Sequence, residues 1–402
     1  MSKKFVIAIF AASFGCFLIV GASFLREAGM LKKHPEARYL TEAEEAVRPV
    51  YSQLSDKEKA AYEALYRGIS EHKENIALPY DLKGETYSKL YCLVEKQEAG
   101  LFYASSSFYT AKVVGNARIM YRDDPEEIEK RIGEMQIAEK KALDTIGSTK
   151  SEQELARRIH DYLIRCCTYI TGEDQLYSST AYGCLVERKA NCEGYAKAFG
   201  LLASKVGLQS VLITGRTDKG ENHAWNQVNI DGKWYNIDVT WDDTDVSGDI
   251  RKNYFLCSDE EFGITHFADR AYFEPFKCED NSKNYYVSND LLINSLEKAE
   301  SVLRREMLAG NETIELKFGS KDVYKAFKNR FIDNHEIFDL AVSCGKDSGN
   351  QISVTLHENE KSLCITVISV CPKTPKLEAE SGLKLLFNKN QAKLLKKQGK
   401  MK

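Results

Sequence analysis

Three side chains that can cooperate in nucleophilic catalysis, Cys192, His223 and Asp238, occur in that order within one short stretch of the chain. A thiol needs a neighbouring base to become a nucleophile near neutral pH, and the base needs an acceptor that fixes its tautomer. The three residues therefore restrict the fold to one that brings the segments around them together. These segments are Ala190-Asn191-Cys192-Glu193-Gly194, Asn222-His223-Ala224-Trp225 and Trp234-Tyr235-Asn236-Ile237-Asp238.

The pattern around Cys192 is typical of a helix start. The sequence predicts a helix over residues 192–206 that ends at Gly207, a residue that suits a helix C-terminus. Backbone N–H groups and the positive end of the helix dipole would stabilise a thiolate at its first turn. One of these N–H groups would also bind an oxyanion formed on an attacked carbonyl. The alternative is structural: Cys192 is a small buried residue that begins a core helix.

A β-hairpin is predicted to carry the other two residues. Asp231-Gly232 is a preferred pair for a two-residue turn, and it lies between strand-like segments over residues 223–230 and 234–240. Such a turn places Ile230 opposite Lys233 and thereby fixes the register of the whole hairpin.

In this register, His223 lies opposite Thr240 and Asp238 lies opposite Trp225. His223 and Asp238 then project from one face as diagonal neighbours about 7 Å apart, which their side chains can bridge. A slip of one residue would put them on opposite faces. The alternative is that either residue is a structural side chain of the strand.

Taken together, these segments resemble the transglutaminase-like superfamily, within the papain-like cysteine enzymes. The resemblance is clearest over residues 178–243 and looser over 152–286. The matching pieces are Ala181-Tyr182-Gly183, Cys192-Glu193-Gly194-Tyr195-Ala196, His223-Ala224-Trp225-Asn226, and Trp234-Tyr235 with Asp238-Val239-Thr240-Trp241-Asp242. One difference is Asn191, where bacterial members usually carry a small apolar residue.

The resemblance implies a role for each matching residue. Cys192 would be the nucleophile, His223 the base and Asp238 the carboxylate that orients the base. Tyr182 is a candidate second oxyanion donor. Trp225 and Trp241 are candidate walls of the cleft, with packing against the helix as the alternative.

No metal and no cofactor is expected. The chain has no pair of cysteines with two residues between them, the spacing found in zinc sites. The acidic residues from Asp243 to Asp249 have the early spacing of a calcium loop. However, Tyr254 stands where such a loop needs a glutamate, so a solvated acidic loop is the preferred interpretation.

The predicted fold class is α+β: a papain-like transglutaminase core, with the cysteine helix packed on an antiparallel sheet that bears His and Asp, flanked by small α+β modules. Strands are also expected over 101–109 and 337–342, and the similar element order on both sides of the core suggests a duplicated βαββ module. The predicted divisions are an N-terminal transmembrane anchor or signal segment over 1–30, an α+β module over 31–146, the core over 147–286, and an α+β module with a Lys-rich tail over 287–402.

The N-terminal segment bears on location. Lys3 and Lys4 precede an uncharged, mostly apolar run over residues 5–25, long enough to span a bilayer as a helix and also typical of a secretory signal. We expect a single-pass protein of the cell membrane with its catalytic region outside the cytoplasm, or a secreted protein if the segment is cleaved. The net charge of −3 gives no general attraction to nucleic acid.

The expected activity is acyl transfer from peptide or protein amides through the three residues, with hydrolysis as the outcome, as in a cysteine peptidase or amidase. The substrate would be a peptide or protein, including those of the cell envelope. Two alternatives stay open. One is an inactive binding or scaffold protein of the envelope, and the other is a protein cross-linking transglutaminase.

Overall fold

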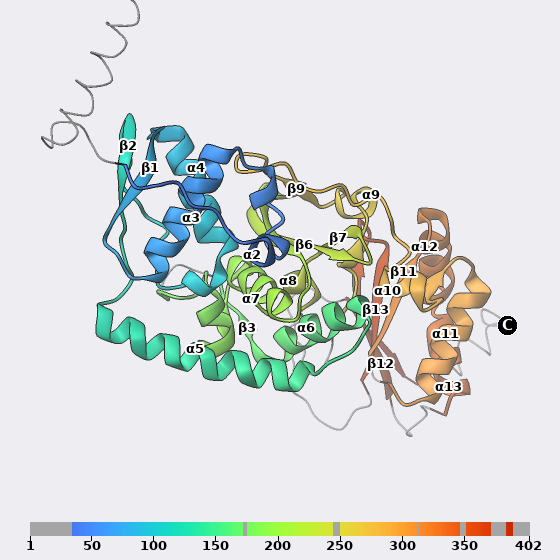
Figure 1. Ribbon diagram of the computed structural model, residues 1–402. Coiled ribbons are helices and arrows are strands. Elements are labelled where there is room, and N and C mark those ends of the chain that lie inside the picture. Colours follow the sequence, from blue (N-terminus) through green and yellow to red (C-terminus); the bar gives the residue numbers. More distant parts are fainter. Residues whose placement is uncertain are drawn as a thin grey trace, which may run out of the picture. The chain divides into compact units, whose positions relative to one another are not determined.

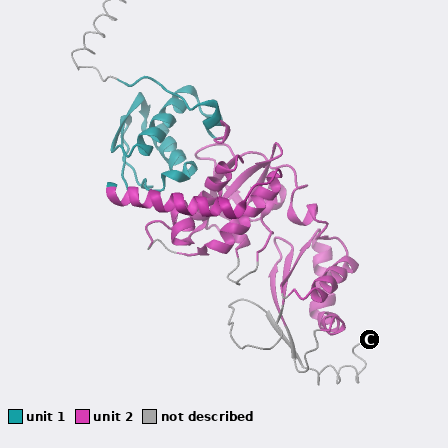
Figure 2. Cartoon of the chain, turned by 60° about the horizontal axis from the view of Figure 1, so that its bottom comes forward, with its two compact units in different colours: residues 1–45, 50–125 teal, residues 46–49, 126–402 magenta. Residues whose placement is uncertain are grey.

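The computed structural model describes residues 34–171, 175–243, 250–311, 313–345, 351–370 and 383–388. These residues form two compact units, 34–45 with 50–125 and 46–49 with 126 onward, coloured separately in Figure 2. The apolar segment over residues 5–25 lies outside the described residues. No helix within the described ranges is long and apolar enough to cross a membrane. The predicted four-part division of the chain stays a prediction.

The first unit pairs two strands beside its helices. It contains α3 (Asp56–Ser70), β1 (Asn75–Lys83), α4 (Gly84–Gln97) and β2 (Val113–Arg118), and β1 and β2 are antiparallel. The strand expected over residues 101–109 is wrong. Residues 101–104 are all buried, which a strand with alternating faces does not allow, and they follow a 3₁₀ turn over Ala99–Leu101.

The second unit contains a five-stranded antiparallel sheet in the order β8-β7-β6-β5-β9. Three of its strands, β6, β7 and β9, are labelled in Figure 1. Its strands are β5 (Ser210–Thr217), β6 (Asn222–Ile230), β7 (Lys233–Ile237), β8 (Phe255–Cys257) and β9 (His266–Ala268). The helix α7 (Cys192–Lys205) packs against β5 and β6. The other elements of this part are α5 (Pro125–Ile146), α6 (Glu152–Cys166), β3 (Thr168–Tyr169), β4 (Lys189–Ala190), α8 (Val239–Asp242), α9 (Asp259–Phe262) and α10 (Tyr285–Ser288). The mixed α+β fold with a papain-like core is confirmed.

The hairpin of β6 and β7 has the predicted turn and register. Both turn residues, Asp231 and Gly232, have positive φ, as the expected turn type requires. Ile230 pairs with Lys233, and the register runs unbroken to the pair of Asn226 and Ile237.

The predicted end of the second strand is wrong. The strand β7 ends at Ile237, because the Asp238 carboxylate accepts the backbone N–H groups of Thr240 and Trp241 and so begins the short helix α8. The expected pairings of His223 with Thr240 and of Trp225 with Asp238 therefore do not form.

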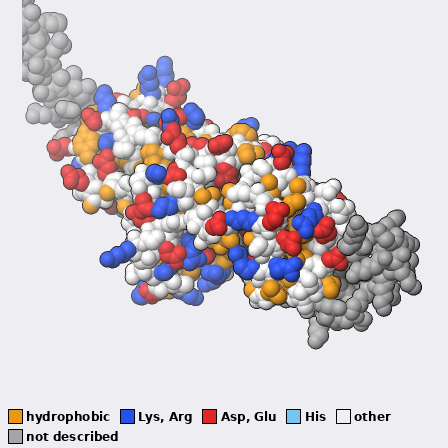
Figure 3. Space-filling view, turned by 90° about the vertical axis from the view of Figure 1, so that its right-hand side faces the viewer, with side chains coloured by type: hydrophobic (Ala, Val, Ile, Leu, Met, Phe, Trp, Pro, Cys, Tyr) orange, Lys and Arg blue, Asp and Glu red, His pale blue; other side chains and the backbone are white. Residues whose placement is uncertain are grey.

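The C-terminal part of the second unit has its own sheet, in the order β10-β11-β13-β12-β14, with helices beside it (Figure 1). The strands are β10 (Leu292–Ile293), β11 (Thr313–Phe318), β12 (Gln351–Asn359), β13 (Cys364–Val370) and β14 (Leu383–Asn388), and the helices are α11 (Leu296–Leu308), α12 (Lys321–Phe327) and α13 (Glu336–Ser343). On the face drawn in Figure 3, acidic and basic side chains are interspersed.

The strand expected over residues 337–342 is the helix α13. Ile337, Phe338, Leu340 and Ala341 are buried, and this spacing is that of one helix face. The predicted duplication is also wrong, because within the described residues the first unit pairs two strands whereas this sheet has five.

Candidate active site

The reactive candidate Cys192 occupies the first position of α7. The helix is capped by Asn191, whose side-chain oxygen accepts the backbone N–H of Gly194 at 3.2 Å. A small apolar residue at position 191 would not make this bond, so the residue that departs from the bacterial pattern serves as a cap here. Cys192 is half-buried and lies against Ala196 and a sheet residue, Leu212.

The close packing around Gly194 explains why this position has no side chain. A Cβ at this position would lie 2.4 Å from the carbonyl oxygen of Ser178 and 2.8 Å from the Cβ of Ala190. The first turn of α7 is therefore pressed against the segment that precedes it. The first backbone N–H groups of a helix have no partners within it, and Cys192 occupies this first turn.

The imidazole of His223 lies between Cys192 and Asp238. Its Nε2 is 2.6 Å from Asp238 Oδ2, and because a carboxylate only accepts, the ring N–H donates. Burial lowers the pKa of His223. The charge of Asp238, its hydrogen bond and a hydrogen bond with Cys192 outweigh burial and raise the pKa to about 10. The structure thus brings the three predicted residues together, although Asp238 comes from the cap of α8 rather than from a strand.

Asp238 is fully buried and engages both of its oxygens. Oδ1 accepts from the backbone N–H of Thr240 at 2.9 Å, from the Thr240 hydroxyl at 2.6 Å and from the N–H of Trp241 at 3.2 Å. Burial alone would raise the pKa of Asp238. The positive charge of His223 and hydrogen bonds from His223 and His266 lower it well below its usual range. The carboxylate is therefore fixed as an anion in a single orientation.

His266, on β9, is a member of the site that the sequence did not predict. Its Nε2 lies 3.0 Å from Asp238 Oδ2, the oxygen that His223 also uses, and its Nδ1 lies 2.9 Å from Thr265 Oγ1. Burial lowers the pKa of His266, so the ring is neutral and donates one N–H to the carboxylate. No pattern around Ile264-Thr265-His266-Phe267 marks this residue, and the only available signal was that the chain has seven histidines.

His223, Asp238 and His266 also present three potential metal-ligating atoms within 4.8 Å of one another. Their separations of 2.6 and 3.0 Å are those of hydrogen bonds, which account for the arrangement without an ion. The expectation that no metal takes part stays a prediction.

The two candidate tryptophans have different surroundings. Trp225 is buried and packs its ring between His223, Phe262 and His266, with centroid distances of 5.1 to 6.2 Å. It forms an internal wall behind the imidazoles. Trp241 is half-buried, lies 5.5 Å from the His223 ring and 4.4 Å from the His266 ring, and lines an open cavity. Trp241 is therefore the tryptophan that a bound molecule can reach.

The structure does not bring the Tyr182 hydroxyl to the triad. This hydroxyl donates to Glu134 and accepts from Arg131 at 3.1 Å, and both partners lie on α5. These bonds hold the hydroxyl against α5, and the role of Tyr182 as the second oxyanion donor stays a prediction. The calcium-like spacing is also not tested, since residues 244–249 lie outside the described residues.

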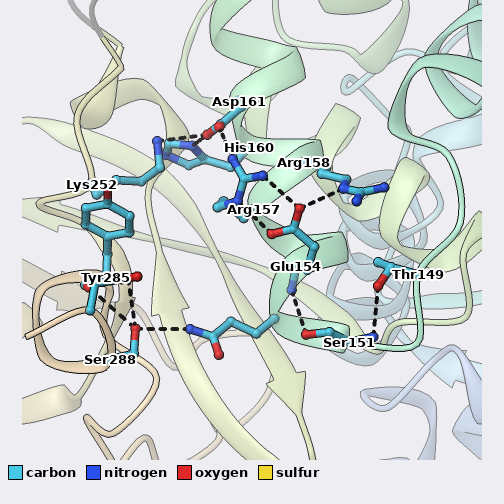
Figure 4. Close-up of polar contacts among 12 residues, drawn as sticks. Thr149, Ser151, Glu154, Arg157, Arg158, His160, Asp161, Lys252, Tyr285 and Ser288 are labelled. Atoms are coloured by element: carbon cyan, nitrogen blue, oxygen red, sulfur yellow. Dashed lines mark hydrogen bonds and ion pairs between the residues drawn. The ribbon is translucent and has the colours of Figure 1, made fainter.

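A buried polar network supports the segment that follows Asp238. His160, fully buried on α6, lies between Asp161 at 3.0 Å and Asp242 at 3.2 Å, and Asp242 also accepts the backbone N–H of Tyr254. Lys252 lies 2.8 Å from Asp161, as Figure 4 shows. The network ties the end of α8 to α6 and so fixes the turn that carries Asp238 and Trp241.

A thiol at a helix start, an imidazole beside it and a buried carboxylate behind the imidazole form the arrangement that papain-like cysteine enzymes use. Residues 139–239 match the sequence profile of the Transglutaminase-like superfamily, and this part of the chain belongs to that superfamily. The matched range includes all three residues.

Similar proteins cover only part of the chain. The kyphoscoliosis peptidases of Mus musculus and Homo sapiens are 34% and 33% identical over 90 residues, which is 20% of this chain and 14% of each relative. The chain thus spans a small share of their length. A solved structure described as a TGase is 18% identical, covers 29% of this chain and 33% of its own, and has a TM-score of 0.25.

The raised pKa of His223 predicts a pH-dependent stability. An unfolded histidine titrates near about 6.5, whereas the folded ring titrates at about 10. The imidazolium therefore stabilises the fold fully below about pH 6.5, and this contribution is lost as the pH rises towards about 10. We expect the free energy of unfolding to fall more steeply with pH in the wild type than in His223→Gln. Urea unfolding between about pH 6 and about pH 9.5 measures this, and parallel curves would contradict it.

Proposed function

We propose that the chain is a cysteine enzyme that transfers acyl groups from peptide or protein amides, with water as the final acceptor. The observation that carries the proposal is the contact chain from Cys192 through His223 to Asp238. The 2.6 Å bond between the imidazole and the buried carboxylate holds the ring in one orientation beside the sulfur. The two similar proteins are both named peptidases, which supports hydrolysis.

The first half of the reaction forms a thioester. The Cys192 thiolate attacks the amide carbonyl carbon, and the carbonyl electron pair moves onto oxygen. Backbone N–H groups at the start of α7 then stabilise this oxyanion. As the oxyanion collapses, the C–N bond breaks and His223 donates its ring proton to the departing nitrogen. The amine leaves and the acyl group stays on sulfur.

The second half regenerates the enzyme. The now neutral His223 accepts a proton from water as the oxygen attacks the thioester carbonyl, and collapse of the second intermediate breaks the C–S bond. The carboxylic acid leaves and the thiolate with its imidazolium returns. A primary amine in place of the water would give a new amide, which is the cross-linking alternative. Asp238 keeps its charge in both halves and orients the ring.

The proposal can be tested by labelling the wild-type protein with a reactive peptide. This peptide carries a thiol-reactive group in place of the amide that would be cleaved. We expect the label to map to Cys192 and to react there at least about 100-fold faster than at Cys166. Cys166 is a matched internal control, since it is also half-buried but burial raises the pKa of its thiol to about 12.

The products separate the alternatives. If a peptide releases a new carboxylate at a rate that an added primary amine does not change, the result supports hydrolysis. Preferential incorporation of that amine supports cross-linking. A folded protein whose Cys192 reacts no faster than Cys166 would defeat the enzyme proposal and leave the scaffold alternative.

A further inference from the structure

An open cavity of about 930 Å³ lies in the second unit, between the catalytic core and the C-terminal sheet. The core contributes Trp241, Ile264 and Thr265 to its lining, together with the turn between β5 and β6. The C-terminal region contributes the turn between β12 and β13 and the start of α12. A space of this size accommodates several residues of an extended polypeptide.

The cavity adjoins the triad. The ring of Trp241, which lines it, lies 5.5 Å from the ring of His223. Thr265 lines it as well and is bonded to His266, which in turn holds Asp238. A chain that lies in the cavity therefore contacts Trp241, whose ring packs against the imidazole that would donate a proton to the leaving group.

The two walls are held together by buried polar contacts. Lys317 Nζ on β11 lies 2.5 Å from Glu261 of α9, and Asn253 Nδ2 donates to Glu315 Oε1 at 2.6 Å. Lys317 is buried, so separation of the walls would leave its charge without a partner. The cavity is therefore a fixed feature of this unit.

The lining contains three carboxylates and three lysines, but the ion pairs of the carboxylates leave one of these lysines over. Each of its three carboxylates contacts a lysine: Asp218 with Lys361, Glu360 with Lys321 at 3.1 Å, and Glu358 with Lys328. Lys219, which also lines the cavity, is exposed and makes no ion pair within the described residues. Lys219 is thus the lining lysine that no described carboxylate pairs with, and it lies beside the apolar surfaces of Trp241 and Ile264.

We propose that this cavity binds the polypeptide substrate, and that Lys219 selects a chain with an acidic side chain near the amide that is cleaved. This inference rests on the proposed function and names its substrate class. The half-buried Trp241 and the exposed Ile264 contact the apolar part of the bound chain. The C-terminal region serves as the second wall of the substrate site.

The selection can be tested with peptides that differ only by Glu, Gln or Lys at one position. This position is moved stepwise along the peptide, on both sides of the cleaved amide. We expect the wild type to show a kcat/KM about fivefold higher for the Glu than for the Lys peptide at one position, as suits an exposed charge. In Lys219→Glu this preference is expected to reverse. Lys277→Glu is the matched control, because Lys277 is exposed and outside the cavity lining. It should keep the wild-type preference.

Binding separates this inference from the proposed function. Titration of Cys192→Ala with the same peptides, followed by tryptophan fluorescence, should give a Glu preference that Lys219→Glu reverses in the same background. If these peptides bind with that preference but the wild type never turns them over, the cavity stands and the enzyme proposal fails. If they are cleaved with a preference that Lys219→Glu leaves unchanged, the enzyme proposal stands and the selection by Lys219 is overturned.

Discussion

Replacing Cys192 by alanine is expected to lower kcat/KM for peptide amides at least about 10⁴-fold, because the change removes the sulfur that would form the thioester beside His223. The variant should fold normally. Cys192 is half-buried, the cap by Asn191 uses the backbone of Gly194, and alanine favours a helix. Turnover of a fluorogenic peptide measures the loss, and circular dichroism with urea unfolding measures the fold.

Two comparisons make this result specific. Cys166→Ala removes another half-buried thiol and should retain activity. Cys192→Ser keeps a hydroxyl at the same position, yet an alcohol is far less ionised than a thiol, so its activity should also be low. Retention of more than a tenth of the wild-type rate by Cys192→Ala would rule out the nucleophile assignment.

Replacing Asp238 by alanine is expected to lower the free energy of unfolding by about 3–5 kcal/mol, the range for a broken buried ion pair. The change removes the acceptor of two buried rings, His223 and His266, and the cap of α8 at Thr240 and Trp241. Activity of the remaining folded protein should fall about 10²- to 10⁴-fold, because the imidazole loses its fixed tautomer. Urea unfolding and peptide turnover below the transition give the two quantities.

His266→Gln is the control that separates the two effects. It removes one of the contacts of Asp238 and leaves the bond to His223 in place. We expect a smaller loss of stability than in Asp238→Ala, and turnover that still exceeds that of Asp238→Ala. Equal stability of Asp238→Ala and the wild type would show that the buried contacts of this carboxylate do not hold the fold.

The parts of the site that the sequence predicted depend on local chemistry. The turn residues Asp231 and Gly232 fixed the register of the hairpin because each adopts the positive φ that this turn needs. The helix that starts at Cys192 was expected from the pattern of small residues after it and from Gly207 at its end, whereas the cap by Asn191 is seen only in the structure. In both cases the decisive interactions lie within a few residues.

The parts that the sequence did not predict depend on contacts between distant segments. Asp238 follows strand-like residues, yet its own cap interactions end the strand. Residues 337–342 are rich in apolar side chains that suit a strand or a helix, and burial of one helical face decides between them. His266 reaches Asp238 across 28 residues, and Tyr182 turns towards α5 for partners that no local pattern identifies.

His223 and His266 both contact the same oxygen of Asp238, so one carboxylate must balance any positive charge on the two rings. One negative carboxylate balances one imidazolium, and the second ring, His266, stays neutral because it is buried beside that cation. A further cation beside His266 would have to share this carboxylate with His223. An inhibitor that carries an ammonium group next to His266 would therefore compete with the imidazolium for Asp238, whereas a neutral group would not.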